Sequence, residues 1–186
     1  MHLIETYALN CGLKIEKPHI KLEEIELPSK NYITAHTYCE KGSGRNYRNW
    51  NSVMLELISN EEFDFEIVHI GGLESERLIG CNDKYLGKTN FHQLAYLISN
   101  SQLHLGYDSF PVHLASHFSK KIVALYNSYS QHSYPYWSDP KDIVLLEMDY
   151  DQHGKPSYAY SDPLDLMNKI EYMTVVNSVL QLLGMS

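Results

Sequence analysis

The sequence predicts an α/β fold in which a mostly parallel sheet is flanked by helices. Short apolar, β-branched segments alternate with amphipathic segments of helical spacing, which is typical of strand–helix–strand units. The chain has 186 residues, of which 44% are hydrophobic, enough for the core of one domain. Neither an internal repeat nor a low-complexity tract interrupts this alternation.

The first 30 residues are expected to form a helix and a linker, and residues 31–186 the main domain. In residues 2–11 the apolar side chains share one helical face, and Gly12 is a natural stop. Residues 13–30 contain two prolines and alternate only weakly, so they are interpreted as a linker.

In the main domain, apolar runs rich in β-branched residues predict strands, and apolar residues at helical spacing predict helices. Asn90 is expected to cap the helix that follows it, and Pro111 is tolerated in a first turn. Asp162 and Pro163 are similarly placed before the last helix. The expected strands are 31–36, 64–70, 84–87, 102–107, 121–126 and 142–148, and the expected helices are 50–59, 73–80, 90–100, 111–119 and 162–184.

Composition excludes several classes of protein. The formal net charge of -8 argues against a dedicated nucleic-acid binder. There is no apolar run near the roughly 18 residues of a spanning helix, and no signal-peptide pattern, so a cytoplasmic protein is the expectation. The three cysteines lie far apart, and His113 and His117 lack a third ligand, so neither a disulfide framework nor a metal site is expected.

The loops that follow the strands should share one edge of the sheet, where parallel α/β sheets bind ligands. The first of these loops carries Lys41, Arg45 and Arg48 among glycines. The basic side chains can pair with phosphate oxygens, and the glycines allow a close approach of the backbone. The alternative is a solvated basic loop without a ligand.

The second loop begins with Gly71 and Gly72, followed by Glu74 and Glu76. Paired glycines and a carboxylate suit a site that accepts hydrogen bonds from ribose hydroxyls. The sequence does not match the dinucleotide-binding glycine fingerprint. The alternative is a simple turn, with acidic residues favouring a helix N-terminus.

The third loop places Asp108 and Ser109 between a strand and a helix, with His113 one turn into that helix. The two polar side chains can cap free backbone N–H groups, and the same N–H groups can bind an anion. His113 is expected to face the same space. The alternative is a capped helix with a packed histidine.

The stretch "YLGKTNFHQLAYLISNSQLHLGYDSFPVHLASHFSKKIVALYNS" resembles the C-terminal half of the family 9 glycosyltransferases, the bacterial heptosyltransferases. "GGLESER", "GRNYRNW" and the tail "DPLDLMNKIEYMTVVNSVLQLLG" fit further elements of that family in order, so the resemblance covers residues 31–184. It implies a Rossmann-like domain of the GT-B architecture that binds a nucleotide sugar, usually ADP-heptose.

The resemblance also implies roles for the residues of the loops. The diphosphate is expected to face Asp108, Ser109 and His113, and its charge to be neutralised by Lys41, Arg45 or Arg48. The ribose would be held by Glu76 or Glu74, and the base would lie near Gly87, Lys88 and Thr89. Neither a metal nor another cofactor is implied, and no catalytic residue is assigned, because the family's candidate base belongs to an N-terminal acceptor domain absent from this sequence.

Two positions depart from the family pattern: Phe110 replaces a glycine and Tyr107 a frequent asparagine. Phe110 is expected to crowd the phosphates or to demand a different backbone angle, so Phe110→Gly should raise nucleotide affinity. A transferase working with a separate acceptor-domain chain or as a homo-oligomer is one hypothesis. The alternatives are a non-catalytic nucleotide-sugar-binding module and a protein-interaction module.

Overall fold

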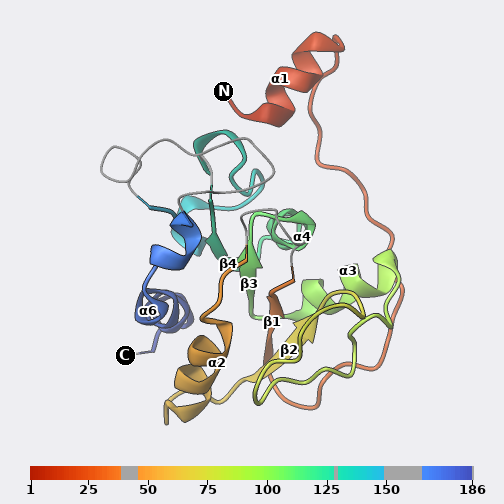
Figure 1. Cartoon of the computed structure of the whole chain (residues 1–186). Helices are drawn as coiled ribbons and strands as arrows, with labels where there is room; N and C mark the ends of the chain where they lie inside the picture. The colour runs from red at the N-terminus through yellow and green to blue at the C-terminus, as the bar shows by residue number, and fades with distance from the viewer. Residues whose placement is uncertain (39–45, 128–129, 149–164, 186) are drawn as a thin grey trace.

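A computed structural model of the chain describes residues 1–38, 46–127, 130–148 and 165–185. Within these residues one five-stranded sheet has the order β2-β1-β3-β4-β5, and every neighbouring pair is parallel. This confirms the predicted α/β fold with a parallel, Rossmann-like sheet (Figure 1). The strands are β1 (Tyr32–His36), β2 (Glu66–Ile70), β3 (Leu103–Tyr107), β4 (Lys121–Leu125) and β5 (Ile143–Leu146).

Helices cover both faces of the sheet (Figure 1). Helices α2 and α6 pack against each other on one face, and α3 and α4 pack against each other on the opposite face. The α-helices are α1 (Leu3–Asn10), α2 (Trp50–Ser59), α3 (Phe91–Asn100), α4 (Phe110–His117) and α6 (Tyr172–Leu183), and 3-10 turns span Ser130–His132, Pro140–Asp142 and Leu166–Lys169.

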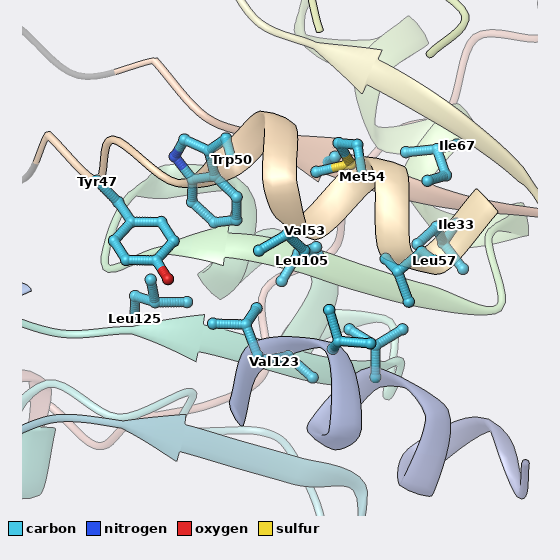
Figure 2. Packing of buried hydrophobic residues seen from close by; sticks show 14 of the residues in the cluster. Ile33, Tyr47, Trp50, Val53, Met54, Leu57, Ile67, Leu105, Val123 and Leu125 are labelled. Carbon is cyan, nitrogen blue, oxygen red and sulfur yellow. The ribbon is translucent and has the colours of Figure 1, made fainter. Parts of the chain in front are cut away.

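The core consists of two hydrophobic layers because alternate side chains of each strand point to opposite faces. In β3, Leu103 and Leu105 point to the layer under α2 and α6, which Figure 2 shows from close by. All five residues of β3 are buried, as a central parallel strand with helices on both faces requires. Short segments rich in apolar and β-branched residues therefore identified the inner strands correctly, although they include Thr34 and His104.

Two predicted elements are wrong. Residues 73–80 form turns instead of a helix, and residues 84–88 form a turn instead of a strand. Asn82 makes the contact with the sheet, since its backbone N–H donates to Ile67 and its carbonyl accepts from His69. Asn82 therefore pairs with the edge of β2 as a single bridge residue.

The predicted C-terminal helix is interrupted. A 3-10 turn at Leu166–Lys169 precedes α6, and Glu171 takes the N-cap position. Asp162 and Pro163, the expected start of this helix, lie outside the described residues.

A capping box stabilises the N-terminus of helix α1. The His2 side chain accepts a hydrogen bond from the Ile4 backbone N–H, and the Glu5 side chain accepts one from the His2 backbone N–H. None of the residues of α1 is buried. The following segment has no regular structure, although Ile20, Ile25 and Leu27 pack against the layer under α3 and α4. The division at residue 30 stays a prediction. No helix in the described part of the chain is long and apolar enough to span a membrane.

Candidate functional site

The strand order places a topological switch point between β1 and β3. From β1 the chain passes through α2 to β2, and from β3 it passes through α4 to β4, which lies on the other side. The two connections diverge at the carboxyl ends of β1 and β3, and such a divergence opens a crevice in which α/β proteins bind ligands. The order of the strands thus predicts where a site should be.

A cavity of about 270 Å³ lies at that point, and we call it the switch-point cavity. Its lining combines polar groups at the strand ends with apolar side chains, as ligand cavities usually do. The lining residues are His36, Ile70, Gly71, Thr89, Leu94, Ser109, Phe110 and Pro111.

Ser109 connects two strand ends in this cavity. It is the N-cap residue of α4, but its side chain makes no capping hydrogen bond. Its hydroxyl lies 3.1 Å from His36 Nδ1, at the end of β1. The predicted capping role of Ser109 is therefore wrong, because the hydroxyl is engaged by a histidine 73 residues away in the sequence.

His36 is uncharged at neutral pH. Burial, with a smaller contribution from the neighbouring His69, lowers the pKa of its imidazole to about 4. A neutral imidazole has one N–H donor and one acceptor nitrogen. His36 can therefore contact both Ser109 and a ligand group without adding a charge to the cavity.

The two glycine turns of the predicted site lie side by side. The Gly87 N–H donates a hydrogen bond to the Gly71 carbonyl at 2.9 Å. Gly71 and Gly87 have φ angles of +148° and +62°, which side-chain-bearing residues rarely adopt. This contact brings Thr89 to the cavity wall next to Gly71, so two of the predicted segments meet at one place.

Asp108 and His113 face each other at the start of α4. Asp108 Oδ1 lies 3.4 Å from His113 Nε2, and the two side chains are 20% and 42% exposed. A protonated His113 would offset the carboxylate charge, which otherwise repels an anion. His113 does not line the switch-point cavity and lies in the wall of a second one.

The remaining predicted residues are less closely associated with this cavity. Glu74, Glu76 and Lys88 are exposed and do not line it, and Gly72 is half-buried beside the Glu74 side chain. Arg48 forms an ion pair of 2.8 Å with Asp165, which precedes α6 in the sequence. The remaining two, Lys41 and Arg45, lie outside the described residues.

Sequence reasoning missed His36 and the network behind it. His69, at the end of β2, places Nδ1 3.0 Å from Asp83 and Nε2 3.0 Å from the Thr37 hydroxyl. Asp83 thus orients a histidine that holds the first residue after β1. Each of two predicted parallel strands, 31–36 and 64–70, has a histidine at or next to its last residue, and this pattern could have indicated the network. In the described part of the chain, no three His, Cys, Asp or Glu side chains are grouped so that they could hold a metal ion.

Comparison with known proteins relates part of the chain to one family. Residues 71–159 match the family model described as glycosyltransferase family 9 (heptosyltransferase). The chain is similar to part of a family 9 glycosyltransferase. The matched residues include Gly71, Thr89, Leu94 and the start of α4, which line the switch-point cavity. No curated protein sequence gives a significant match.

Solved glycosyltransferase structures share the fold. ADP-heptose LPS heptosyltransferase II of E. coli superimposes with a TM-score of 0.62 at 16% identity, over 97% of this chain and 50% of that one. The dodecameric iron-containing glycosyltransferase TibC of enterotoxigenic E. coli H10407 gives 0.69 at 12% identity, over 98% and 53%. TibC in complex with ADP-D-β-D-heptose gives 0.61 at 15% identity, over 88% and 48%. The chain therefore spans about half the length of these proteins.

Proposed function

We propose that this chain binds a nucleotide-diphosphate sugar of the ADP-heptose type at the switch-point cavity and takes part in transferring the sugar to an acceptor. One observation carries the proposal: residues from three separately predicted segments, Gly71, Thr89 and Ser109, line one cavity at the carboxyl edge of the sheet. The matched TibC structure, which contains ADP-D-β-D-heptose, supports the choice of ligand class.

The lining of the cavity suits a nucleoside. Ile70, Leu94 and Phe110 form apolar walls, against which the faces of a flat base can pack. Thr89 and His36 supply hydrogen-bonding groups that can fix the orientation of the base or ribose. The exposed carboxylates of Glu74 and Glu76 remain the proposed ribose ligands.

The diphosphate is proposed to lie at the start of α4, next to the nucleoside. Because the Ser109 hydroxyl bonds to His36, the Ser109 side chain does not cap the first N–H groups of this helix. His113 lies in the same turn and can supply positive charge. Lys41, Arg45 and Arg48 are proposed to add charge from the loop that follows β1.

Titration calorimetry with ADP tests the proposal. We expect saturable binding of ADP, weakened about tenfold by Ser109→Ala, which removes the hydroxyl that positions His36. Ser59→Ala, an exposed serine at the end of α2, is the matched control and should leave the affinity unchanged. Absence of ADP binding at millimolar concentration would exclude the proposed function.

Transfer is tested separately from binding. The acceptor is proposed to be held by a second chain that supplies an acceptor domain or by another copy of this chain. Release of ADP from ADP-heptose in the presence of such a partner is the expected result. Binding of the nucleotide sugar without turnover under those conditions would favour the non-catalytic binding module.

The position of Phe110 gives a further prediction. Its backbone has no positive φ angle, and its ring lies 5.5 Å from the Phe91 ring while it lines the cavity. The ring is thus placed as a wall for the base, and stacking of one base on an aromatic ring contributes about 1–3 kcal/mol. We therefore expect Phe110→Gly to weaken ADP binding about tenfold, the opposite sign to the expectation from sequence.

Calorimetry of Phe110→Gly and of the control Phe91→Leu measures this effect. Phe91 contacts Phe110 but does not line the cavity, so its replacement should change the affinity for ADP much less. Tighter binding by Phe110→Gly would show that the ring obstructs the phosphates after all.

A further inference from the structure

We propose that a second cavity, between α1 and the loop after β4, receives the sugar ring of the nucleotide sugar. This inference rests on the proposed function and extends it to a part of the chain that no comparison assigns. The cavity has a volume of about 330 Å³, and we call it the aromatic cavity. Its lining residues are His2, Leu3, Ile4, Tyr7, His113, Ser133, Tyr136 and Trp137.

Specific contacts hold the two walls of the aromatic cavity together. The imidazole of His2 lies 2.9 Å from the carbonyl oxygen of Tyr134, and the Tyr136 hydroxyl donates to Glu5 Oε1 at 3.0 Å. The His2 ring also contacts the rings of Tyr134 and Tyr136, with centroids 4.6 and 4.9 Å away. Helix α1 is therefore fixed at this place although it buries no side chain in the core.

The opposite wall is fixed by the main domain. The Trp137 backbone N–H donates to the buried Ser116 hydroxyl of α4 at 2.8 Å, and the ring of Tyr136 lies 4.9 Å from that of Trp137. Through this contact the loop takes its position from α4, the helix that also borders the switch-point cavity. The two cavities are thus parts of one framework.

Helix α4 separates the two cavities. Ser109 and Phe110, at its start, line the switch-point cavity, and His113, one turn later, lines the aromatic cavity. A diphosphate held near Asp108 and His113, which lie 3.4 Å apart, would have a cavity on either side. A nucleotide sugar has the same order, because its diphosphate links a nucleoside to a sugar.

The lining of the aromatic cavity suits a sugar ring. The C–H faces of a pyranose are apolar and pack against aromatic rings, whereas its hydroxyls need hydrogen-bonding groups around the rim. Tyr7 and Trp137 supply the rings, and His113 and Ser133 supply polar groups. Tyr7 is 67% exposed and has no packing role in the core, so its ring is accessible to a sugar in this cavity.

The test compares ADP with ADP-heptose and ADP-glucose by titration calorimetry, for the full chain and for Tyr7→Ala. We expect at least one of the nucleotide sugars to bind fivefold or more tightly than ADP. Tyr7→Ala should remove that advantage and leave the affinity for ADP unchanged. Leu9→Ala is the matched control, because Leu9 is as exposed on the same helix and does not line the cavity.

The failures of the two proposals differ. If ADP binds but neither sugar adds affinity, or if Tyr7→Ala leaves the advantage intact, the sugar lies elsewhere and this inference is wrong. If Tyr7→Ala weakens ADP and the nucleotide sugars equally, the aromatic cavity holds the base and the inference is wrong as well. Absence of binding by all three ligands would overturn the proposed function together with this inference.

Discussion

Lowering the pH from 6.5 to 4.5 is expected to reduce the free energy of unfolding by about 4 kcal/mol. Two histidines beneath the candidate site carry this effect. Burial, with a smaller contribution from a neighbouring histidine in each case, lowers the pKa of His104 to about 3 and that of His36 to about 4, from an ordinary 6.5. Burial lowers the pKa of His69 as well, and the hydrogen bond and negative charge of Asp83 oppose this lowering.

The sign of the effect follows from proton binding. Between pH 6.5 and about 4 the unfolded chain protonates these histidines and the folded chain does not. Their stabilising contribution is therefore fully present above pH 6.5 and is lost as the pH falls toward 4 and 3. Each such histidine contributes about 1.4 kcal/mol per pH unit across this interval, somewhat less near its folded pKa.

Urea unfolding at pH 7, 6, 5 and 4.5 measures this loss. His104→Gln should lower the slope of the unfolding free energy against pH by the equivalent of about one bound proton. This holds whatever the substitution costs in stability at pH 7. The exposed His19, changed to glutamine, is the control and should leave the slope as in the unaltered chain. A free energy of unfolding that stays constant down to pH 5 would contradict the neutral, buried state of these histidines.

Replacing Gly106 by alanine is expected to destabilise the protein by about 2 kcal/mol and to abolish ADP binding. Gly106 is paired with His36 across β1 and β3. An added Cβ would lie 2.9 Å from the His36 carbonyl oxygen, 3.2 Å from His104 Nε2 and 3.5 Å from His36 Cβ. The nearest of these atoms belongs to backbone, so relief of the clash requires the two strands to move apart.

That movement would occur where His36 contacts Ser109. The affinity for ADP should therefore fall by a larger factor than the loss of unfolding free energy alone would produce. Thermal unfolding and ADP calorimetry of Gly106→Ala measure the two effects. Gly12→Ala serves as the control: its Cβ would have no neighbour within 4 Å, although its φ of +66° costs about 1 kcal/mol. A Gly106→Ala protein that binds ADP normally would show that the spacing of β1 and β3 does not control the site.

The sequence by itself determined the inner strands and the helices that flank them. β4 is an apolar run after Lys121, β3 alternates apolar residues with His104 and Gly106, and the flanking helices carry apolar residues at helical spacing, because burial of a face leaves a local period in the sequence. The placement of Ser109 between a strand and the helix that follows it came from the same local information, although the helix begins at Phe110, one residue before the predicted start. A strand-to-helix junction is a property of consecutive residues.

The tertiary structure alone decided which of these junctions meet. His36 and Ser109 are partners because β1 and β3 are neighbours in the sheet, and strand order leaves no local pattern. Residues 73–80 looked helical but form turns and irregular structure, and Asn82, just after them, pairs with β2. Pairing between distant segments depends on the competition of all of them for the same neighbours, and only the folded chain resolves that competition.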